Sequence, residues 1–502
     1  MSRICLCLTG RTLTQDLEIL DKNRKYVDIA ELRVDCLDPD EHFQIRRFPE
    51  QAGIPVILTI RRDMDGGFYH SGEGSRITLF SKALAFAEAD RRKNFAFVDM
   101  EEDLNVPSLE EAARTFGTRI IRSCHNREGI GDDLVKKLKS LRHVGDEIPK
   151  IALTPRSMAD VVQVYRAAGE AMDFDKILLC MGHYGINTRI LAEQMGSYLS
   201  YTSATDEPEI PQAAPGHISP RNLAEVYRFR EITPKTRIFG ITGYPLKATS
   251  SPVFFNKVFT EEHIDAVYVP FPSDSPEAFL ELAAELKLAG ASVTVPYKER
   301  IISHLTAMAN EVKALGACNT IIPYTSGWIG YNTDAGGFSD SLLQFIDRKN
   351  LRGCRITIIG AGGAARAVAS EVYRLRGKAL ILNRTTVRAK ELALPYHFSW
   401  GCTDNQGAVM MEKFSDIIIQ TTPVGMEGDI DGDPMPEFKF YGREKVMDLI
   451  YKPERTPFLK RAMAAGCSVL NGYDMFLSQA RYQYRYFMGR EFPSQLISRI
   501  QF

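Results

Sequence analysis

Short apolar runs alternate with helical patterns along the first 230 residues of the chain. The helical stretches include Ala159–Met172 and a segment opened by a capping box at Ser108–Glu111. Eight strands in regular alternation with helices predict an α/β fold of the (β/α)8 barrel type. The apolar runs are Ile4–Leu8, Ile29–Val34, Val56–Ile60, Phe95–Met100, Arg119–Ser123, Ile151–Leu153, Ile177–Cys180 and Leu199–Thr202.

A different pattern follows near the middle of the second half. An apolar strand ending at Ile359 runs into a glycine turn, an alanine-rich helix and a second strand, Ala379–Leu382. The G-x-G-x-x-A spacing in this βαβ unit suits a dinucleotide pyrophosphate at the start of a helix. A glycine-rich turn of some other α/β domain is the alternative. The residues expected near the phosphates are Gly360, Ala361, Gly362, Gly363 and Ala364.

The residues after that second strand indicate which dinucleotide binds. An NAD site usually has Asp or Glu there, whereas this chain has Asn383, Arg384 and Thr385, with Arg388 close behind. A guanidinium suits the 2′-phosphate of NADP, so NADP is the predicted cofactor. The alternative is that Arg384 is an ordinary surface charge.

Composition narrows the class of protein. The 502 residues, 44% hydrophobic and 25% charged, are typical of a globular protein of roughly three structural units. A net charge of −1 argues against a nucleic-acid partner, and no apolar run is long enough to span a membrane. Nine scattered cysteines without CxxC spacing predict reduced thiols and a cytoplasmic protein. No cysteine or histidine spacing predicts a metal site.

Charged residues follow strand after strand in the predicted barrel. Such residues share one face of a barrel, where active sites lie, although a single one could be a solvated strand end. Lys150, at the start of its strand, and His125 suggest a lysine that forms a Schiff base and a histidine that moves a proton. The segments are Glu31–Asp35, Thr59–Arg61, Asp99–Glu101, Ser123–Asn126, Lys150 and Met181–Arg189.

The first half resembles type I 3-dehydroquinate dehydratase in its segments EL-R-x-D, T-x-R, D-x-E, S-x-H-N, PKIA and G-x-x-x-x-R. The resemblance implies that Lys150 is the Schiff-base lysine, His125 the general acid/base and Glu101 the carboxylate that orients His125. It also implies a substrate-binding set of Glu31, Arg33 and Arg61 on the ring hydroxyls, Arg189 on the carboxylate, and His217 in the closing loop.

The closing loop departs from the family pattern. The family usually has S-A-P-G-Q where this chain has Ala213-Ala214-Pro215-Gly216-His217. The serine hydroxyl is lost, whereas His217 can still donate a hydrogen bond. The departure concerns how firmly the loop grips the substrate.

In the second half, Lys298 and Asp334 are the best candidates for proton transfer. A carboxylate beside a lysine orients it and controls its charge. Taken alone, Lys298 would more often be a surface lysine.

The segments G-x-P, V-T-x-P-x-K, G-A-x-N-T, N-T-D and G-A-G-G-A-A-R resemble shikimate dehydrogenase. The resemblance implies NADP contacts from the glycine turn, from Arg384 and from the Thr421–Met426 turn, and we also expect Gly472 near the cofactor. The family's H-S-x-S-P is Ala248–Pro252 here, which leaves quinate open as a substrate. The residues expected to line the shikimate pocket are Thr249, Ser251, Thr294, Lys298, Asn319, Asp334, Tyr451 and Gln479.

Together these patterns predict three parts. A barrel at 1–230 precedes an α/β substrate domain at 231–335, to which a C-terminal helix at 473–502 returns, and a Rossmann-type NADP domain occupies 336–472. The predicted function is dehydration of 3-dehydroquinate followed by NADPH-dependent reduction to shikimate. The partners are then small-molecule substrates, with the oligomeric state left open. One rival is a dehydratase joined to a quinate dehydrogenase. The other is a metabolite-sensing regulator with the same folds, whose mark would be the loss of Lys150, His125 or Lys298, and none of these is lost here.

Overall fold

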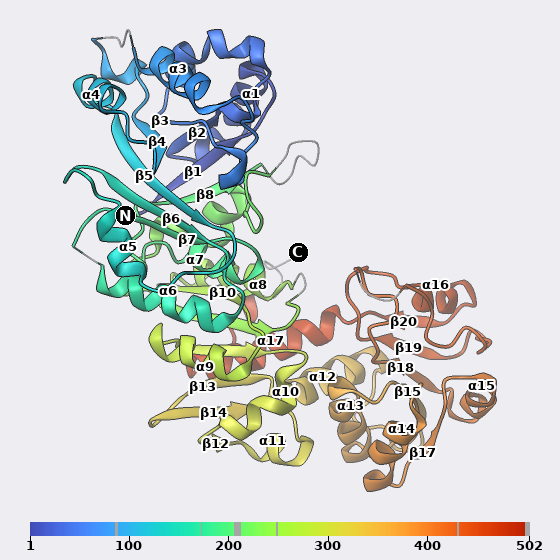
Figure 1. Cartoon of the computed structure of the whole chain (residues 1–502). Helices are drawn as coiled ribbons and strands as arrows, with labels where there is room; N and C mark the ends of the chain where they lie inside the picture. The colour runs from blue at the N-terminus through green and yellow to red at the C-terminus, as the bar shows by residue number, and fades with distance from the viewer. Residues whose placement is uncertain (86–88, 172, 205–211, 247–248, 429–430, 497–502) are drawn as a thin grey trace. The chain divides into compact units, whose positions relative to one another are not determined.

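The computed structural model describes residues 1–85, 89–171, 173–204, 212–246, 249–428 and 431–496 (Figure 1). Packing divides the chain into two compact units, Met1–Leu288 and Ala289–Gln501. The domain boundaries at 230, 335 and 472 therefore stay predictions. Among the described residues, no helix combines the length and apolar character that a membrane crossing requires.

The first unit begins with the predicted barrel. Its eight strands are parallel and follow the order β7-β6-β5-β4-β3-β2-β1-β8. The strands β7 and β8 meet through a single bridge between Lys176 and Ser197, which nearly closes the barrel. The strands are β1 (Arg3–Leu8), β2 (Ile29–Arg33), β3 (Val56–Thr59), β4 (Phe97–Glu101), β5 (Arg119–Asn126), β6 (Ile148–Leu153), β7 (Ile177–Cys180) and β8 (Leu199–Ser203).

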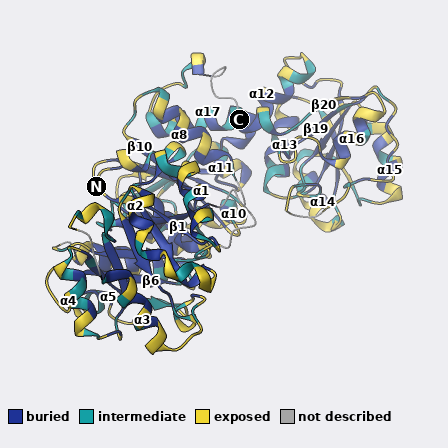
Figure 2. Cartoon of the chain, turned by 90° about the horizontal axis from the view of Figure 1, so that it is seen from above, coloured by how far each residue is buried: buried dark blue, intermediate teal, exposed yellow. Residues whose placement is uncertain are grey.

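Side chains at alternate positions of these strands fill the barrel. Cys5 and Cys7, Ile177 and Leu179, and Leu199 and Tyr201 are such pairs, all within one buried cluster. Figure 2 shows β1 and β6 dark blue, with exposed residues on the surrounding helices and loops. The helices of the barrel are α1 (Leu13–Asn23), α2 (Phe48–Ala52), α3 (Glu73–Leu84), α4 (Pro107–Thr115), α5 (Leu134–Ser140), α6 (Met158–Glu170) and α7 (Ile186–Ile190).

All eight predicted strands are present, but two local predictions need correction. Lys150 lies within β6 rather than at its start, because that strand begins two residues earlier, at Ile148. The capping box is wrong: α4 begins at Pro107 with Val106 before it, and no side chain caps its first turn. Proline suits a first helical position, where the missing N–H has no partner in any case. Met172, the predicted end of α6, lies outside the described residues.

The first unit continues beyond the barrel. The strands β9 (Arg237–Gly243) and β10 (Ala266–Pro272) pair in parallel, and the helices α8 (Ser251–Glu261) and α9 (Pro276–Glu285) follow them. Helix α9 packs on α6 of the barrel. Arg166 of α6 pairs with Glu281 of α9 at 2.9 Å. The barrel and this strand pair thus share one packing unit.

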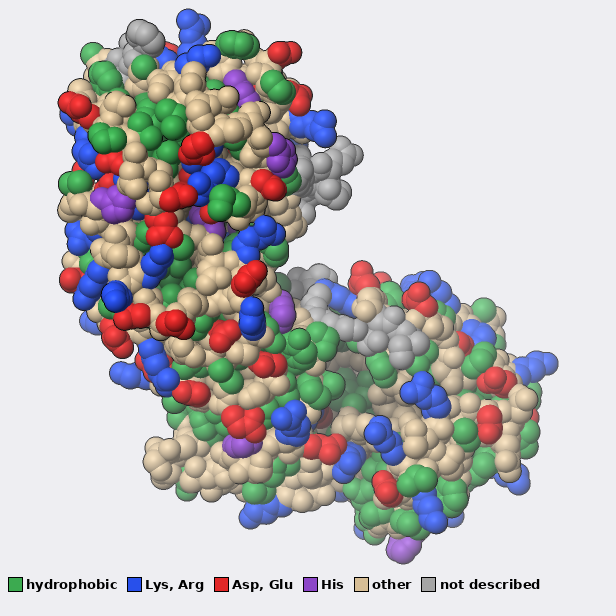
Figure 3. Space-filling model, viewed as in Figure 1, with side chains coloured by type: hydrophobic (Ala, Val, Ile, Leu, Met, Phe, Trp, Pro, Cys, Tyr) green, Lys and Arg blue, Asp and Glu red, His purple; other side chains and the backbone are tan. Residues whose placement is uncertain are grey.

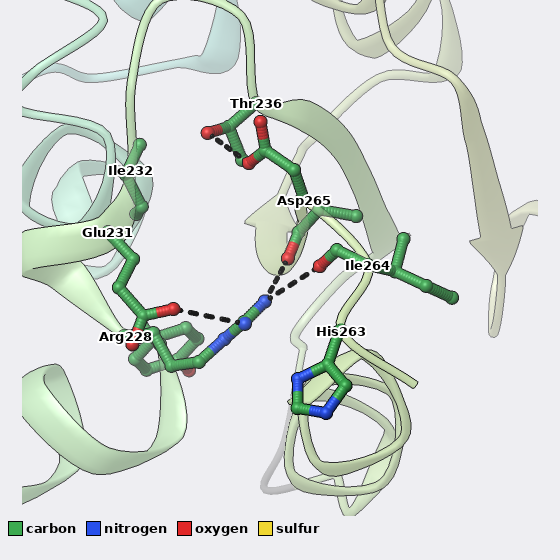
Figure 4. A pocket seen from close by; sticks show the side chains of 9 residues that line it. Arg228, Glu231, Ile232, Thr236, His263, Ile264 and Asp265 are labelled. Atoms are coloured by element: carbon green, nitrogen blue, oxygen red, sulfur yellow. Dashed lines mark hydrogen bonds and ion pairs between the residues drawn. The ribbon is translucent and has the colours of Figure 1, made fainter. Parts of the chain in front are cut away.

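The passage from barrel to β9 is hydrogen-bonded rather than loose. Arg228, with a left-handed backbone (φ 49), donates to the carbonyls of Ile264 and Ala266 at 3.2 and 2.8 Å. The Thr236 hydroxyl donates to Asp265 at 2.7 Å. A cavity of about 290 Å³ opens between these residues (Figure 4). The passage between the barrel and β9 is therefore held by hydrogen bonds near both of its ends.

The second unit holds two groups of strands. In the first group, β11 (Gly290–Val293) and β14 (Gly327–Tyr331) each run antiparallel to β13 (Thr320–Tyr324), and β12 (Ala307–Met308) runs parallel to β14. The second is a parallel sheet in the order β17-β16-β15-β18-β19-β20, the doubly wound arrangement of a Rossmann fold. Its strands are β15 (Arg355–Ile359), β16 (Lys378–Leu382), β17 (Ser399–Gly401), β18 (Ile417–Gln420), β19 (Lys445–Asp448) and β20 (Ser468–Leu470).

Apolar clusters cover both faces of the parallel sheet. One is built on Ile356 and Ile358 and the other on Ile359 and Ile418, because successive strand residues point to opposite faces. The helices of this unit are α10 (Tyr297–Arg300), α11 (Asn310–Leu315), α12 (Asp334–Ile346), α13 (Gly363–Arg374), α14 (Thr386–Ala393), α15 (Asn405–Met411), α16 (Pro457–Ala464) and α17 (Tyr473–Met488).

The last helix packs against the antiparallel strands and α12. Gln483 of α17 accepts from Ser292 of β11 at 3.0 Å and donates to the Thr320 hydroxyl at 3.0 Å. The helix ends at Met488, before a left-handed glycine, Gly489, so it is shorter than the predicted span to 502. Residues 497–502 lie outside the described residues.

The surface carries mixed charge. On the face drawn in Figure 3, lysine and arginine are interspersed with aspartate and glutamate. In the described part of the chain, no group of histidine, cysteine and acidic side chains has the geometry to hold a metal ion.

Two candidate active sites

The first site is a cavity of about 130 Å³ at the carboxyl ends of the barrel strands. The sequence predicted most of its polar lining, because parallel strands bring their carboxyl ends to one face. The predicted residues that line it are Glu31, Arg33, Arg61, His125, Lys150, Arg189 and His217.

Lys150 lies at the centre of the charges in this cavity. Its Nζ atom is 2.7 Å from an Asp99 carboxylate oxygen and 3.8 Å from Glu31 Oε1. The ring of Tyr201 is 4.4 Å from Nζ. A buried amine among carboxylates and an aromatic ring is held in one place, as a nucleophile needs to be.

Asp99 is a site residue that the sequence analysis did not single out. It also accepts from Arg61 at 2.8 Å and from the Ser123 hydroxyl at 2.6 Å. Burial alone would raise the pKa of Asp99, but the positive charges of Arg61 and Lys150 outweigh burial and lower it. The carboxylate is therefore a permanent anion beside Lys150.

Glu101 is bound by two arginines. Its two oxygens accept from Arg61 and from Arg76, each at 2.6 Å, and its predicted role toward His125 stays a prediction. Arg76 reaches this point from α3 and is fully buried. Glu101 positions Arg61, whose guanidinium bridges Glu101 and Asp99.

His125 lines the same cavity as Lys150 and is a neutral imidazole. Burial lowers its pKa well below the ordinary value, and the charges of Arg61 and Lys150 lower it further against the opposing effect of Asp99. Its buried Nδ1 has no hydrogen-bond partner among the described residues. A neutral histidine with a free ring nitrogen can accept a proton.

Arg189 offers unpaired donors to the same cavity. Its side chain is almost fully buried, and its Nε and NH2 atoms have no partner among the described residues. Burial lowers the pKa of this guanidinium to about 10, so it stays charged near neutral pH. An unpaired buried cation of this kind is strongly stabilised by an incoming carboxylate.

Arg33 and Glu31 are fixed by their neighbours. Asp35 accepts two hydrogen bonds from Arg33, at 2.9 and 2.7 Å, and a backbone bond from Arg61. The Thr59 hydroxyl donates to Glu31 at 2.9 Å. Asp35 thus orients two of the cavity's arginines at once.

The closing loop is docked on the strand-seven side of the cavity. The Gly182 N–H donates to the Pro215 carbonyl at 3.0 Å. Gly216 has a φ of +79, and a Cβ there would lie 2.5 Å from the Gly182 carbonyl. Only glycine fits this close approach, and it places Ala213 and His217 in the cavity wall.

The second site centres on Lys298 and Asp334 in the second unit. Lys298 Nζ lies 2.7 Å from an Asp334 oxygen, and Asn319 donates to the other oxygen at 2.8 Å. Asn319 also lies 3.4 Å from the Gln479 side-chain oxygen. Four of the predicted residues, from α10, the start of β13, α12 and α17, therefore form one hydrogen-bonded chain.

The other predicted residues of the shikimate pocket are placed as follows. Thr294 directly follows β11, and Tyr451 stacks on Phe476 with ring centroids 5.3 Å apart. In the first unit, the Thr249 hydroxyl lies 3.2 Å from the Ser251 hydroxyl at the start of α8. Ala248, which precedes them in the motif, lies outside the described residues.

The predicted cofactor turn has the geometry of a phosphate site. Gly360 has a φ of +117, and a Cβ there would lie 2.3 Å from the Thr421 hydroxyl, so this position requires glycine. Among the described residues, nothing lies within 4 Å of where a Cβ on Gly362 or Gly363 would be. Gly362 is exposed, Ala361 and Ala364 are half-buried, and the first turn of a helix has N–H groups without partners in the helix itself.

The end of β16 carries a free positive charge. Asn383 donates to the Thr385 carbonyl at 3.0 Å, which holds this turn. Arg384 and Arg388 are exposed, and neither forms an ion pair with the residues that the structure describes. No carboxylate occupies the position of the NAD-specific acid. These residues fit a 2′-phosphorylated dinucleotide.

Two further residues near the cofactor turn have packing roles. Gln420 is buried and holds the following turn through bonds to Thr422 and Val424. Gly472 is needed because a Cβ there would lie 2.0 Å from the Leu449 carbonyl.

The fold and the two sites define a class of protein: a barrel lyase followed by a nucleotide-dependent oxidoreductase. The sequence model of the family described as type I 3-dehydroquinase matches residues 4–234. That of the shikimate dehydrogenase substrate binding domain matches residues 241–321.

Individual relatives agree with these matches. A bifunctional 3-dehydroquinate dehydratase/shikimate dehydrogenase of Arabidopsis thaliana, named as chloroplastic, is 28% identical over 93% of this chain and 79% of its own length. A shikimate dehydrogenase (NADP(+)) of Shouchella clausii is 34% identical over 53% of this chain and 98% of its own length. A solved shikimate dehydrogenase from Aquifex aeolicus is 32% identical over 53% of this chain and 98% of its own, with a TM-score of 0.48.

The chain belongs to the bifunctional family in which a type I 3-dehydroquinase precedes a shikimate dehydrogenase. Its two activities are dehydration of dehydroquinate and NADP-dependent shikimate dehydrogenation, both in the shikimate pathway.

Proposed function

We propose that Lys150 forms an imine with the ketone of 3-dehydroquinate and that His125 moves the protons of the dehydration. The observation that carries this proposal is the buried Lys150 amine in one cavity with a neutral His125. Attack on a ketone requires an amine that has lost a proton, and His125 can accept it. Asp99, 2.7 Å from Nζ, orients the amine and stabilises the positive charge of the imine.

Lys150 and His125 also carry out the remaining steps of the dehydration. The amine nitrogen bonds to the carbonyl carbon and the oxygen leaves as water. His125 then takes the proton from the neighbouring carbon, and the electron pair moves into an enamine. The enamine expels the ring hydroxyl, which leaves as water with the proton from His125. Water finally hydrolyses the conjugated imine, releasing 3-dehydroshikimate and free Lys150.

The charged side chains that line the cavity orient the substrate. Arg189 binds the substrate carboxylate, because its two unpaired buried donors match a carboxylate. Arg33, Arg61 and Glu31 bind the ring hydroxyls, each fixed by a second side chain.

We propose that Lys298 supplies the proton in the second reaction. Lys298 Nζ would donate to the ketone oxygen as it gains negative charge, while Asp334 and Asn319 keep the amine in position. Reduced NADP supplies the hydrogen and electrons for the carbonyl carbon. Its phosphates would lie at the start of α13 and its 2′-phosphate at Arg384.

We also place the enzyme in the cytoplasm and give it small-molecule partners only. The nine cysteines are all free thiols, which suits a reducing compartment. Reduction of shikimate-pathway intermediates requires no nucleic-acid or membrane partner.

Borohydride trapping tests the imine directly. Borohydride added with 3-dehydroquinate should inactivate the dehydratase and add the mass of the reduced substrate adduct to a peptide containing Lys150. Lys176, a second lysine buried in the barrel, is the internal control and should stay unlabelled. Label on Lys176 instead, or none under turnover, would rule out the assignment.

A further inference from the structure

His217 of the closing loop is tied to a side chain behind the cavity. Its Nδ1 atom is hydrogen-bonded to the hydroxyl of Ser203, the last residue of β8. His217 lines the cavity, whereas Ser203 does not line it and is buried. The pair therefore joins the loop, through its one half-buried imidazole, to the wall of the barrel.

The bonding of Ser203 determines which nitrogen of His217 carries the proton. Within the described residues, the Ser203 hydroxyl has a single hydrogen bond, the one to His217. If Nδ1 donated to this hydroxyl, the buried hydroxyl hydrogen would have no acceptor, which is unfavourable. The favoured arrangement has Ser203 donating to Nδ1. The proton of a neutral ring is then on Nε2.

The neutral ring is the relevant form. Burial lowers the pKa of His217 well below its ordinary value, and the nearby charges of Arg189, Arg33 and Lys150 lower it further. A neutral imidazole donates from one nitrogen only, so its tautomer decides whether it donates to the substrate or repels it.

We propose that Ser203 is a positioning residue of the dehydratase that fixes His217 as the Nε2–H tautomer, so that Nε2 donates to a substrate oxygen beside Arg189. This inference rests on the proposed dehydratase reaction. The Nδ1 edge of the ring is held at Ser203, which leaves the Nε2 edge for the cavity. The docking of Pro215 on Gly182 holds the loop backbone at the same place.

The proposal explains how a histidine can serve in this loop. A glutamine amide always presents donors, whereas a histidine has the same ability only when a neighbour sets its tautomer. Ala213 cannot help, because it has no hydroxyl. Ser203 supplies the missing control from the end of β8.

A double-mutant cycle tests the coupling between the two residues. Ser203→Ala alone should lower dehydratase kcat/KM by about tenfold, the lower end of the range for a hydrogen bond to a charged group, mainly through KM. His217→Gln supplies the reference for the second half of the cycle, whatever its own kcat/KM, because its amide donates without help from a neighbour. In the His217→Gln background, Ser203→Ala should then change kcat/KM by less than about twofold. The separate variant Ser203→Thr, which keeps the hydroxyl, should have the KM of the wild type.

Three results would overturn the proposal. Equal losses from Ser203→Ala in both backgrounds would mean a structural role only. Tautomer control would be excluded if Ser203→Ala left kcat/KM of the otherwise wild-type enzyme unchanged. It would also be excluded if Ser203→Thr lowered kcat/KM as much as Ser203→Ala does. The full-length chain is used throughout, and its dehydrogenase rate serves as the folding control for each variant. A wild-type enzyme without dehydratase activity would instead refute the reaction, and no cycle could then be measured.

A spectroscopic readout separates tautomer from activity. In protein labelled with ¹⁵N-histidine, the ring signals of His217 are those that disappear in His217→Gln. Their ¹H–¹⁵N couplings should show the proton on Nε2. Ser203→Ala should mix the two tautomers. A proton on Nδ1 in the wild type would contradict the proposal even if the kinetics agreed with it.

Discussion

The two proposed catalytic lysines lie in very different surroundings. The side chain of Lys150 is 6% exposed and faces two carboxylates and an aromatic ring inside the barrel. The side chain of Lys298 is 18% exposed and has one carboxylate partner, Asp334. Both Nζ atoms nevertheless lie 2.7 Å from an aspartate oxygen.

The difference teaches that an ion pair alone does not define a lysine's chemistry. In the barrel, a neutral histidine in the same cavity can remove the protons that imine formation and dehydration release. At Lys298 the partners are Asp334, Asn319 and, through Asn319, Gln479, which position a donor. The first setting favours covalent catalysis and the second favours proton donation.

The largest expected effect comes from removing the nucleophile. Lys150→Ala should lower dehydratase kcat by more than about 10⁴-fold, since covalent catalysis ends with the amine. Steady-state formation of the conjugated product measures the loss. Reduction of 3-dehydroshikimate by the same variant should stay near the wild-type rate. A tenfold loss there, with the fold intact, would mean that the two sites are coupled.

Removing the proton donor should cost less. Lys298→Ala should lower dehydrogenase kcat by about 10²- to 10⁴-fold, the usual size for a general acid. Consumption of NADPH measures this rate, and Lys313→Ala, on the exposed face of α11, is the matched control. Asp334→Asn combined with Lys298→Ala should cost little more than Lys298→Ala alone, because the two act as a unit. Full additivity would contradict that coupling.

Cofactor choice should respond to a single charge. Arg384→Asp should reduce the preference for NADPH over NADH by about 10- to 150-fold, the effect of losing a charge-assisted contact of about 1.5–3 kcal/mol. The ratio of kcat/KM values for the two cofactors measures it. Arg376→Asp, remote from the start of α13, should leave that ratio unchanged. An unchanged ratio in Arg384→Asp would show that the end of β16 does not read the 2′-phosphate.

The smallest expected effect concerns the pH dependence of the dehydratase reaction. The base form of His125 persists as the pH falls, because burial and the charges of Arg61 and Lys150 lower its pKa. Dehydratase kcat/KM should therefore fall less than twofold between about pH 7 and pH 6, where a histidine of ordinary pKa would cost about threefold. His217→Gln should show the same profile. An ordinary acid limb that persists in His217→Gln would place the pKa of His125 near its usual value.

The fold was largely predictable because a short local pattern of apolar residues marks each strand. Eight apolar runs bounded by charged residues gave all eight barrel strands, and the glycine turn gave the start of the Rossmann sheet. Local patterns depend on neighbours in sequence, which the chain supplies directly. The exact position of Lys150 within β6 depended on Ile148 and Pro149, which lengthen that strand toward its start.

Most residues of the barrel site could be predicted from the sequence, but their hydrogen-bond and ion-pair partners could not. Asp99 and Glu101 are two residues apart on β4 and point the same way, so sequence alone cannot assign one to Lys150 and the other to Arg61. Arg76 arrives from a helix and Ser203 from another strand, and neither belongs to a motif. Such contacts depend on tertiary packing.

The bonded passage at Arg228 has a practical consequence for dividing this chain. A cut after residue 230 would remove the carbonyls of Ile264 and Ala266 from Arg228, and α9 from α6. A fragment that retains every one of these bonds ends at Leu288, where the first compact unit ends. To express the lyase by itself, the chain is therefore best ended at Leu288, which lies beyond the 3-dehydroquinase match at residues 4–234 and inside the shikimate dehydrogenase match at residues 241–321.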